Sequence, residues 1–65
     1  MLNAQQIKEL REELLLSQEE FSELFGVTRT TVSNWEKGKT KPTFKIMRKI
    51  KDKYNDIKFT ITKEK

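Results

Sequence analysis

The side chains best suited to chemistry lie in the stretch GVTRTTVSNWEKG, residues 26–38. Between Thr28 and Asn34 it carries four hydroxyl groups, one guanidinium and one amide, and no carboxylate. The guanidinium of Arg29 has the geometry to bond guanine O6 and N7, and the amide of Asn34 has the geometry to bond adenine N6 and N7. Both residues are therefore candidates for reading DNA bases. The alternative is contact with phosphates, which positions a protein without reading sequence.

Charge is distributed unevenly along the chain. Residues 1–28 carry two basic and six acidic side chains, a net charge of −4, whereas residues 29–65 carry twelve and four, a net charge of +8. Within residues 29–51, eight basic side chains accompany a single acidic one, Glu36. Such a positive region attracts polyanions such as nucleic acids. The alternative is that lysines on exposed helix faces keep a small domain soluble.

The sequence offers no constellation for catalysis or metal binding. The chain has no Cys and no His, which removes disulfides, thiolate metal sites, the commonest zinc ligand and the commonest general base. We therefore expect no enzyme activity, no cofactor, no metal and no small-molecule ligand. A cluster of carboxylates could suggest paired catalytic acids, but solvated helix faces explain it better: Glu9, Glu12, Glu13, Glu19, Glu20 and Glu23.

The chain length indicates one small domain. At 65 residues, an unassisted core supplies only about 3 to 5 kcal/mol of net stability, so oligomerisation is the remaining source of support. No apolar run approaches the roughly 18 residues of a membrane span. The N-terminal segment MLNAQQIKEL lacks the basic-then-apolar order of a signal peptide. We expect a cytoplasmic protein.

Short-range signals predict where helices start and stop. Ser17 and Glu20 fit a capping box ahead of an eight-residue helix over about residues 18–25, and Gly26 permits the left-handed turn that ends it. Pro42 and Thr43 predict the start of a further helix, which should end near Asn55. Similar signals predict a first helix over about residues 4–15, begun by Asn3 with Gln6, and a third over about residues 28–37, begun by Thr28 and ended by Gly38. Apolar residues are expected on the buried faces of the second and fourth helices: Phe21, Leu24, Phe25, Phe44, Met47, Ile50 and Tyr54.

The last residues change their periodicity. In IKFTITK, Ile57, Phe59 and Ile61 alternate with polar residues, which is the pattern of a half-buried strand. We therefore predict an all-α, compact four-helix domain over residues 1–55, followed by a short β-strand-like tail over residues 56–65.

The second and third predicted helices have the spacing of a helix-turn-helix. Counted from Gln18 as the first position, the motif needs a small residue fifth, glycine ninth, and apolar residues fourth, eighth, tenth, fifteenth and eighteenth. The fifth residue must be small because the next helix crosses closely over it. All seven positions match, with Ser22, Gly26, Phe21, Phe25, Val27, Val32 and Trp35.

The stretch LSQEEFSELFGVTRTTVSNWEKGKTKP resembles the core of the XRE-type helix-turn-helix regulators, which include phage repressors and Cro proteins. The resemblance runs from about Ile7 to Tyr54. It implies a lambda-repressor-like domain that places the helix over residues 28–37 in the major groove of double-stranded DNA. Such proteins are usually dimeric transcriptional regulators of phages, mobile elements and bacterial chromosomes. This chain departs from the family in having Ser22 where Ala is more usual, and in lacking a fifth helix.

The resemblance and the helical spacing together assign roles to individual residues. Arg11 and Glu36 resemble the ion pair that orients the recognition helix in many relatives, and Trp35 is expected in the core. The base-reading face comprises Thr28, Arg29, Thr30, Ser33 and Asn34. Phosphate contacts are expected from Gln18 at a helix N-terminus and from the loop after the recognition helix, at Lys39, Thr40, Lys41 and Thr43.

The expected function is sequence-specific binding of double-stranded DNA by a transcriptional regulator that represses by occupying an operator. A lone strand needs a partner, so we predict that the tail pairs with its copy in a homodimer, through Ile57, Phe59 and Ile61, for a pseudo-palindromic site. A disordered tail on a monomer, and a fifth short helix or intramolecular packing, are the alternatives. The competing function is a protein-interaction or antitoxin-like module with the same fold.

Overall fold

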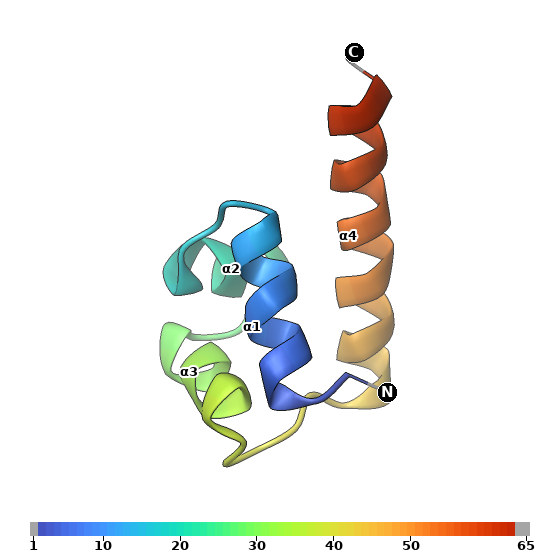
Figure 1. Cartoon of the computed structure of the whole chain (residues 1–65). Coiled ribbons are helices and arrows are strands. Elements are labelled where there is room, and N and C mark those ends of the chain that lie inside the picture. The colour runs from blue at the N-terminus through green and yellow to red at the C-terminus, as the bar shows by residue number, and fades with distance from the viewer. Residues whose placement is uncertain (1, 64–65) are drawn as a thin grey trace.

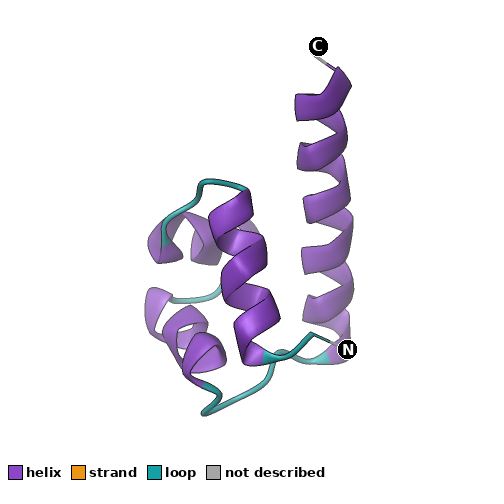
Figure 2. Ribbon diagram, in the orientation of Figure 1, coloured by secondary structure: helices purple, strands orange, loops and turns teal. Residues whose placement is uncertain are grey.

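The computed structural model describes the backbone of residues 2–63 and the side chains of residues 2–58. It contains four helices, α1 (Ala4–Glu13), α2 (Gln18–Phe25), α3 (Arg29–Lys37) and α4 (Phe44–Lys63), and no strand among the described residues (Figures 1 and 2). The all-α fold expected from the sequence is confirmed. No helix in this part of the chain is both long enough and apolar enough to cross a membrane.

The three short helices begin at the capping residues predicted from the sequence. The side chains of Asn3 and Ser17 accept hydrogen bonds from the amides of Gln6 (2.8 Å) and Glu20 (3.1 Å), whose side chains accept in return from the cap amides. Thr28 caps α3 in the same way without the reciprocal bond. Because these bonds satisfy N–H groups that have no partner within the helix, they fix where each helix starts.

The same three helices end in left-handed turns. Gly26 (φ 67°) and Gly38 (φ 76°) occupy this conformation after α2 and α3, as predicted, but after α1 it is adopted by Leu15 (φ 61°). The amides of Leu15 and Leu16 donate to the carbonyls of Glu12 (3.0 Å) and Arg11 (3.2 Å), which is the Schellman pattern. A side chain at such a position is strained, since its Cβ crowds the following carbonyl.

Each helix contributes one almost completely buried residue to the core: Ile7, Phe21, Val32 and Ile50. Phe25 and Trp35 complete the cluster, and the ring of Phe25 meets that of Phe21 edge-on with centroids 4.8 Å apart. Ser22, at the motif position that must be small, is also buried, and its hydroxyl donates to the carbonyl of Glu19 (2.6 Å). The apolar positions of the motif therefore face the core as the spacing predicts.

Two apolar residues that were expected on buried faces lie at the surface. Leu24 is 40% exposed, because its side of α2 faces charged residues of α4 such as Lys49 and Asp52. Phe44 is 71% exposed, since it occupies the first position of α4, beside the open seam between α4 and α1. For both residues, the helical spacing in the sequence predicts a buried side chain, whereas the structure places the side chain at the surface.

The prediction of a C-terminal strand is wrong. Residues 56–63 continue α4 as helix, and α4 therefore ends at Lys63 rather than near Asn55. A helix satisfies its backbone groups within the segment, whereas a strand would need a partner strand, and residues 2–63 contain none. Tyr54, Ile57 and Ile61 are also spaced by three and four residues, so the tail fits the helical period as well. Ile57 is half-buried, and the side chains of Phe59 and Ile61 lie outside the described residues.

A polar cluster ties the distal half of α4 to α1. The hydroxyl of Tyr54 donates to Glu13 Oε2 (2.9 Å), and the ammonium group of Lys58 donates both to Glu13 and to the Tyr54 hydroxyl (2.9 Å). Lys58 also lies over the Tyr54 ring, 5.3 Å from its centroid. The hydrogen bonds from Lys58 and Tyr54 lower the pKa of Glu13.

We predict that Leu15→Asn stabilises the protein. Asn adopts the left-handed conformation more readily than Leu, and Leu15 is 88% exposed and makes no buried contact to lose. The expected gain in the free energy of unfolding is about 1 kcal/mol, measured by urea denaturation. The matched control is Leu24→Asn, within the right-handed helix α2, which should lower stability because Asn is the poorer helix former. A loss of stability at both positions would contradict the assignment of strain to Leu15.

We also predict that acid releases α4 from α1. Because the pKa of Glu13 is lowered in the folded state, its contribution is present above about pH 4.5, its ordinary value, and is lost as the pH falls through the lowered pKa. The measurement is the pH dependence of the Tyr54 ring NMR signals. Glu13→Gln lacks the titrating group and should remove the transition, and an unchanged transition in that variant would contradict the prediction.

Candidate nucleic-acid interface

The outer face of α3 gathers the polar residues that the sequence singled out. Val32 and Trp35 point into the core and anchor the helix, while Thr30 is exposed and Ser33 and Asn34 are half-buried. A shallow depression of about 270 Å³ is lined by Arg29, Thr30, Ser33, Asn34 and Lys37. The helical face expected from the spacing is therefore present. Lys37 also lies on this face and was not among the residues predicted from the sequence. Its position one turn after Ser33 is the signal that places it there.

Thr28 stands at the leading end of α3 with its hydroxyl already engaged. Thr28 Oγ1 accepts from the amide of Thr31 (3.1 Å) and lies 2.9 Å from the Thr31 hydroxyl. Both threonines thus organise the first turn of α3. An incoming base or phosphate would meet the exposed Thr28 side chain and the neighbouring side chain of Arg29, which is also exposed.

The loop after α3 is held against the end of that helix. The amides of Lys39 and Thr40 both donate to the carbonyl of Asn34, at 3.0 and 3.5 Å, and Pro42 is buried. Thr43 Oγ1 accepts from the amide of Ile46 (3.3 Å), as a cap of α4 would. The side chains of Lys39, Thr40, Lys41 and Thr43 are all exposed, so the loop presents two cations and two hydroxyls beside α3.

The expected ion pair between Arg11 and Glu36 is present. Arg11 Nε and Nη2 donate to the two oxygens of Glu36 at 2.7 and 3.1 Å, and Nη1 donates to the carbonyl of Leu16 (2.8 Å). Only 13% of the Arg11 side chain and 6% of the Glu36 side chain are exposed. The hydrogen bond to Glu36 raises the pKa of Arg11. The pair connects the end of α1 to the end of α3.

Gln18 joins the same network, which the sequence did not reveal. As the first residue of α2, it donates one amide hydrogen from Nε2 to Glu36 Oε1 (3.2 Å). Its second amide hydrogen and the backbone N–H groups at the start of α2 remain the groups that could meet a phosphate. No sequence signal links residue 18 to residue 36 apart from their places within the motif.

The structure shows no alternative chemistry in the part of the chain that it describes. No group of three or more His, Cys, Asp or Glu side chains could hold a metal ion there, and no buried polar side-chain atom lacks a hydrogen-bond partner. The carboxylates of α1 and α2 are exposed, apart from their capping and surface interactions.

Comparison with known protein families gives one result. A helix-turn-helix family model matches residues 7–60, well over half of the chain. No curated protein and no solved structure shows a significant match. The matched range covers α2, α3 and most of α1 and α4, and so includes the polar face of α3, the loop and the ion pair.

We predict that Arg11 and Glu36 are energetically coupled. Arg11→Met should cost roughly 3 kcal/mol because it leaves the Glu36 charge buried and uncompensated, and Glu36→Gln should cost a comparable amount. In a double-mutant cycle from urea denaturation, the coupling energy should exceed about 1 kcal/mol. The control cycle uses Gln5 and Glu9, an exposed hydrogen-bonded pair one turn apart on α1, for which about 0.2 to 0.5 kcal/mol is expected. Equal coupling in the two cycles would show that the buried pair has no special role.

Proposed function

The chain belongs to the XRE-type helix-turn-helix family of DNA-binding regulators, and on that premise we propose that it is a sequence-specific transcriptional repressor that acts by occupying an operator. The recognition element is α3, which enters the major groove with its N-terminal residues toward the base edges. Residues 29–65, which include α3, carry twelve basic and four acidic side chains and so supply the positive charge that attracts DNA.

One observation supports DNA rather than protein as the partner of α3. Its outer face is polar and cationic, and the single carboxylate within residues 29–51, Glu36, is neutralised by Arg11 at the far end of the helix. No carboxylate therefore repels phosphates at the leading end. An interface for a protein partner would instead be expected to show exposed aromatic or aliphatic anchors. None lies between Thr28 and Asn34, where Val32 is completely buried.

The residues divide into two roles under this proposal. Base edges are read by the exposed face of α3: Thr28, Arg29, Thr30, Ser33 and Asn34, with Lys37 at its far end. Phosphates are bound by Gln18 and by the loop residues Lys39, Thr40, Lys41 and Thr43. The loop amides bonded to Asn34 hold the phosphate-binding groups at a fixed place relative to the reading face.

We further propose that the protein binds as a homodimer to a pseudo-palindromic operator. One short recognition helix contacts few base pairs, and two of them about 34 Å apart would reach successive major grooves on one face of the duplex. The marginal core of a 65-residue chain also favours association.

The test separates base readers from phosphate binders. Arg29→Ala should relax the preference at one base position, with a loss of about 1 to 3 kcal/mol of discrimination, because its guanidinium reads a base edge. Lys41→Ala should weaken all sequences alike and reduce the slope of log affinity against log salt by about one. The measurement is selection of bound duplexes from a random pool, followed by titrations at several salt concentrations.

Lys8→Ala is the control for charge alone, because Lys8 is exposed on the acidic helix α1. It should leave both base preference and salt slope unchanged. A uniform loss of affinity in Arg29→Ala, with every base preference retained, would overturn its role as a reader. Absence of binding to any duplex at low salt would overturn the proposed function and favour a protein-interaction module.

A further inference from the structure

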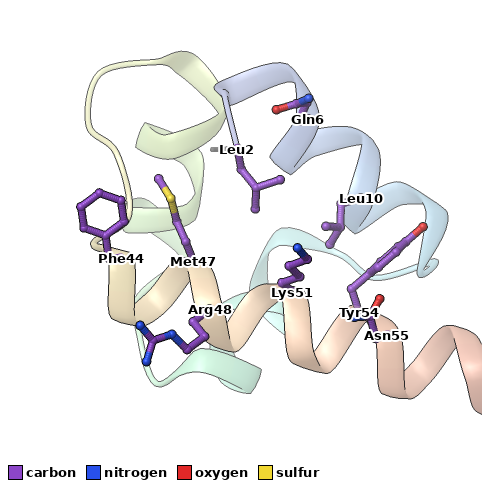
Figure 3. Close-up of a pocket in the computed structure, with 9 residues that line it drawn as sticks. All are labelled: Leu2, Gln6, Leu10, Phe44, Met47, Arg48, Lys51, Tyr54 and Asn55. Carbon is purple, nitrogen blue, oxygen red and sulfur yellow. The ribbon is translucent and has the colours of Figure 1, made fainter.

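A groove lies between α1 and α4. Its volume is about 590 Å³, and its floor is apolar, made by Leu2 from the segment before α1, by Leu10 from α1, and by Met47 and Tyr54 from α4 (Figure 3). Phe44 stands at one end of the groove and is 71% exposed. An exposed aromatic residue beside an apolar floor is typical of a surface that another protein covers.

The α4 side of the groove is basic, and an exposed carboxylate, Glu9, lies beside the groove on α1 and forms its acidic edge. On α4 the lining residues include Arg48 and Lys51, both exposed, and no acidic residue lines the groove. On α1, Glu9 and Glu13 follow the lining residue Gln6 by three and seven positions, so both lie on its side of the helix. Glu13 is engaged by Lys58, whereas Glu9 is exposed and accepts only a surface hydrogen bond from Gln5 (3.1 Å) among the bonds described. The face thus has an acidic edge, an apolar middle and a basic edge.

A face with this order is complementary to itself. Suppose that a second copy is related to the first by a twofold axis that runs along the groove. The rotation exchanges the two edges and leaves each residue at the same height along the groove. The basic edge of each copy then meets the acidic edge of the other, and the apolar floors face each other. A twofold axis across the groove would instead set like charges together, so electrostatics selects the first arrangement.

The same axis agrees with DNA binding. In Figure 3 Leu2 lies near Met47 and Leu10 near Tyr54, so α1 and α4 run in the same direction along the groove. The loop of residues 39–43 lies at the end of the molecule where α4 begins (Figure 1). Rotation about an axis parallel to α4 keeps both loops at the same end of a dimer, which is what two copies on one duplex require.

We propose that the α1–α4 groove is the surface through which two copies of this chain associate, about a twofold axis along the groove. Phe44 packs near Leu2 of the other copy, and Lys51 lies opposite its Glu9. The occupant is a second copy rather than an unrelated acidic helix because each copy supplies both the acidic and the basic edge. The inference deepens the dimeric part of the proposed function, but it is tested without DNA.

The first experiment is sedimentation equilibrium of the full chain without DNA, from ten to several hundred micromolar. The full chain should dimerise in this range, and Phe44→Glu should raise the dissociation constant by about 30-fold or more, because it replaces an apolar anchor of the interface by a charge. Leu15→Glu is the matched control, since Leu15 is also exposed and apolar but does not line the groove. It should dimerise like the unchanged chain. Thermal denaturation of both variants checks that they are folded.

Charge reversal tests the direction of the axis. Glu9→Lys and Lys51→Glu should each weaken dimerisation, because each sets like charges together across the interface. The double variant restores opposite charges and should recover most of the lost affinity. Additive weakening in the double variant would overturn the proposed axis.

The remaining outcomes distinguish failure of the groove proposal from failure of the DNA-binding proposal. A full chain that remains monomeric at several hundred micromolar, or a Phe44→Glu variant that dimerises normally, overturns the groove proposal even if the protein binds operator DNA. Equal loss of dimerisation in Leu15→Glu also overturns it, because association would then be nonspecific. A monomeric Phe44→Glu variant that still binds a half-site duplex supports both proposals. If neither this variant nor the dimeric unchanged chain binds any duplex, only the proposed DNA-binding function is overturned.

Discussion

The arrangement of the three short helices depends on one carboxylate. Glu36 accepts hydrogen bonds from the guanidinium of Arg11 and the amide of Gln18, so α1, α2 and α3 meet at a single side chain that is only 6% exposed. A charge at this depth is costly unless its lone pairs are satisfied. The network therefore does not merely add an attraction. It favours the one relative placement of the helices in which all its members are bonded, and it cancels the negative charge of Glu36 on α3.

Local bonds and packing replace the intrinsic helix stability that these segments lack. Helices of eight to ten residues are marginal in isolation, and the β-branched residues at the start of α3 lower its propensity further. Caps define the first turn of each helix, left-handed residues define the last, and Val32 and Trp35 hold α3 against the core. Because packing holds α3 from one side, its other side can carry short polar residues that are poor for helix stability and suited to a groove floor.

The parts that could be predicted from the sequence are those with short-range signals. The capping pairs, Gly26, Gly38 and the spacing of the helix-turn-helix motif each depend on residues a few positions apart, and the structure confirms them. The length of α4 could not be predicted in this way, since IKFTITK satisfies the period of a strand and nearly that of a helix. The choice between them depends on a partner strand, which the described part of the chain does not contain. The exposure of Leu24 and Phe44 depends on how α4 lies against the other helices, and the bond from Gln18 to Glu36 depends on the folded arrangement.

The attachment of α4 sets how stability is spread through the molecule. Ile50 is the one described residue of α4 within the buried core cluster, and Ile46 packs against it, whereas α1, α2 and α3 share the remaining members. We therefore expect α4 to open as a cooperative unit distinct from the other three helices, with a smaller free energy of opening. Backbone amides near Ile50 should be the best protected from hydrogen exchange in α4, and protection should decline along the helix toward Lys63. Any contact that covers the seam between α1 and α4 joins the two units into one, so association raises the free energy of opening of α4 more than that of the domain as a whole.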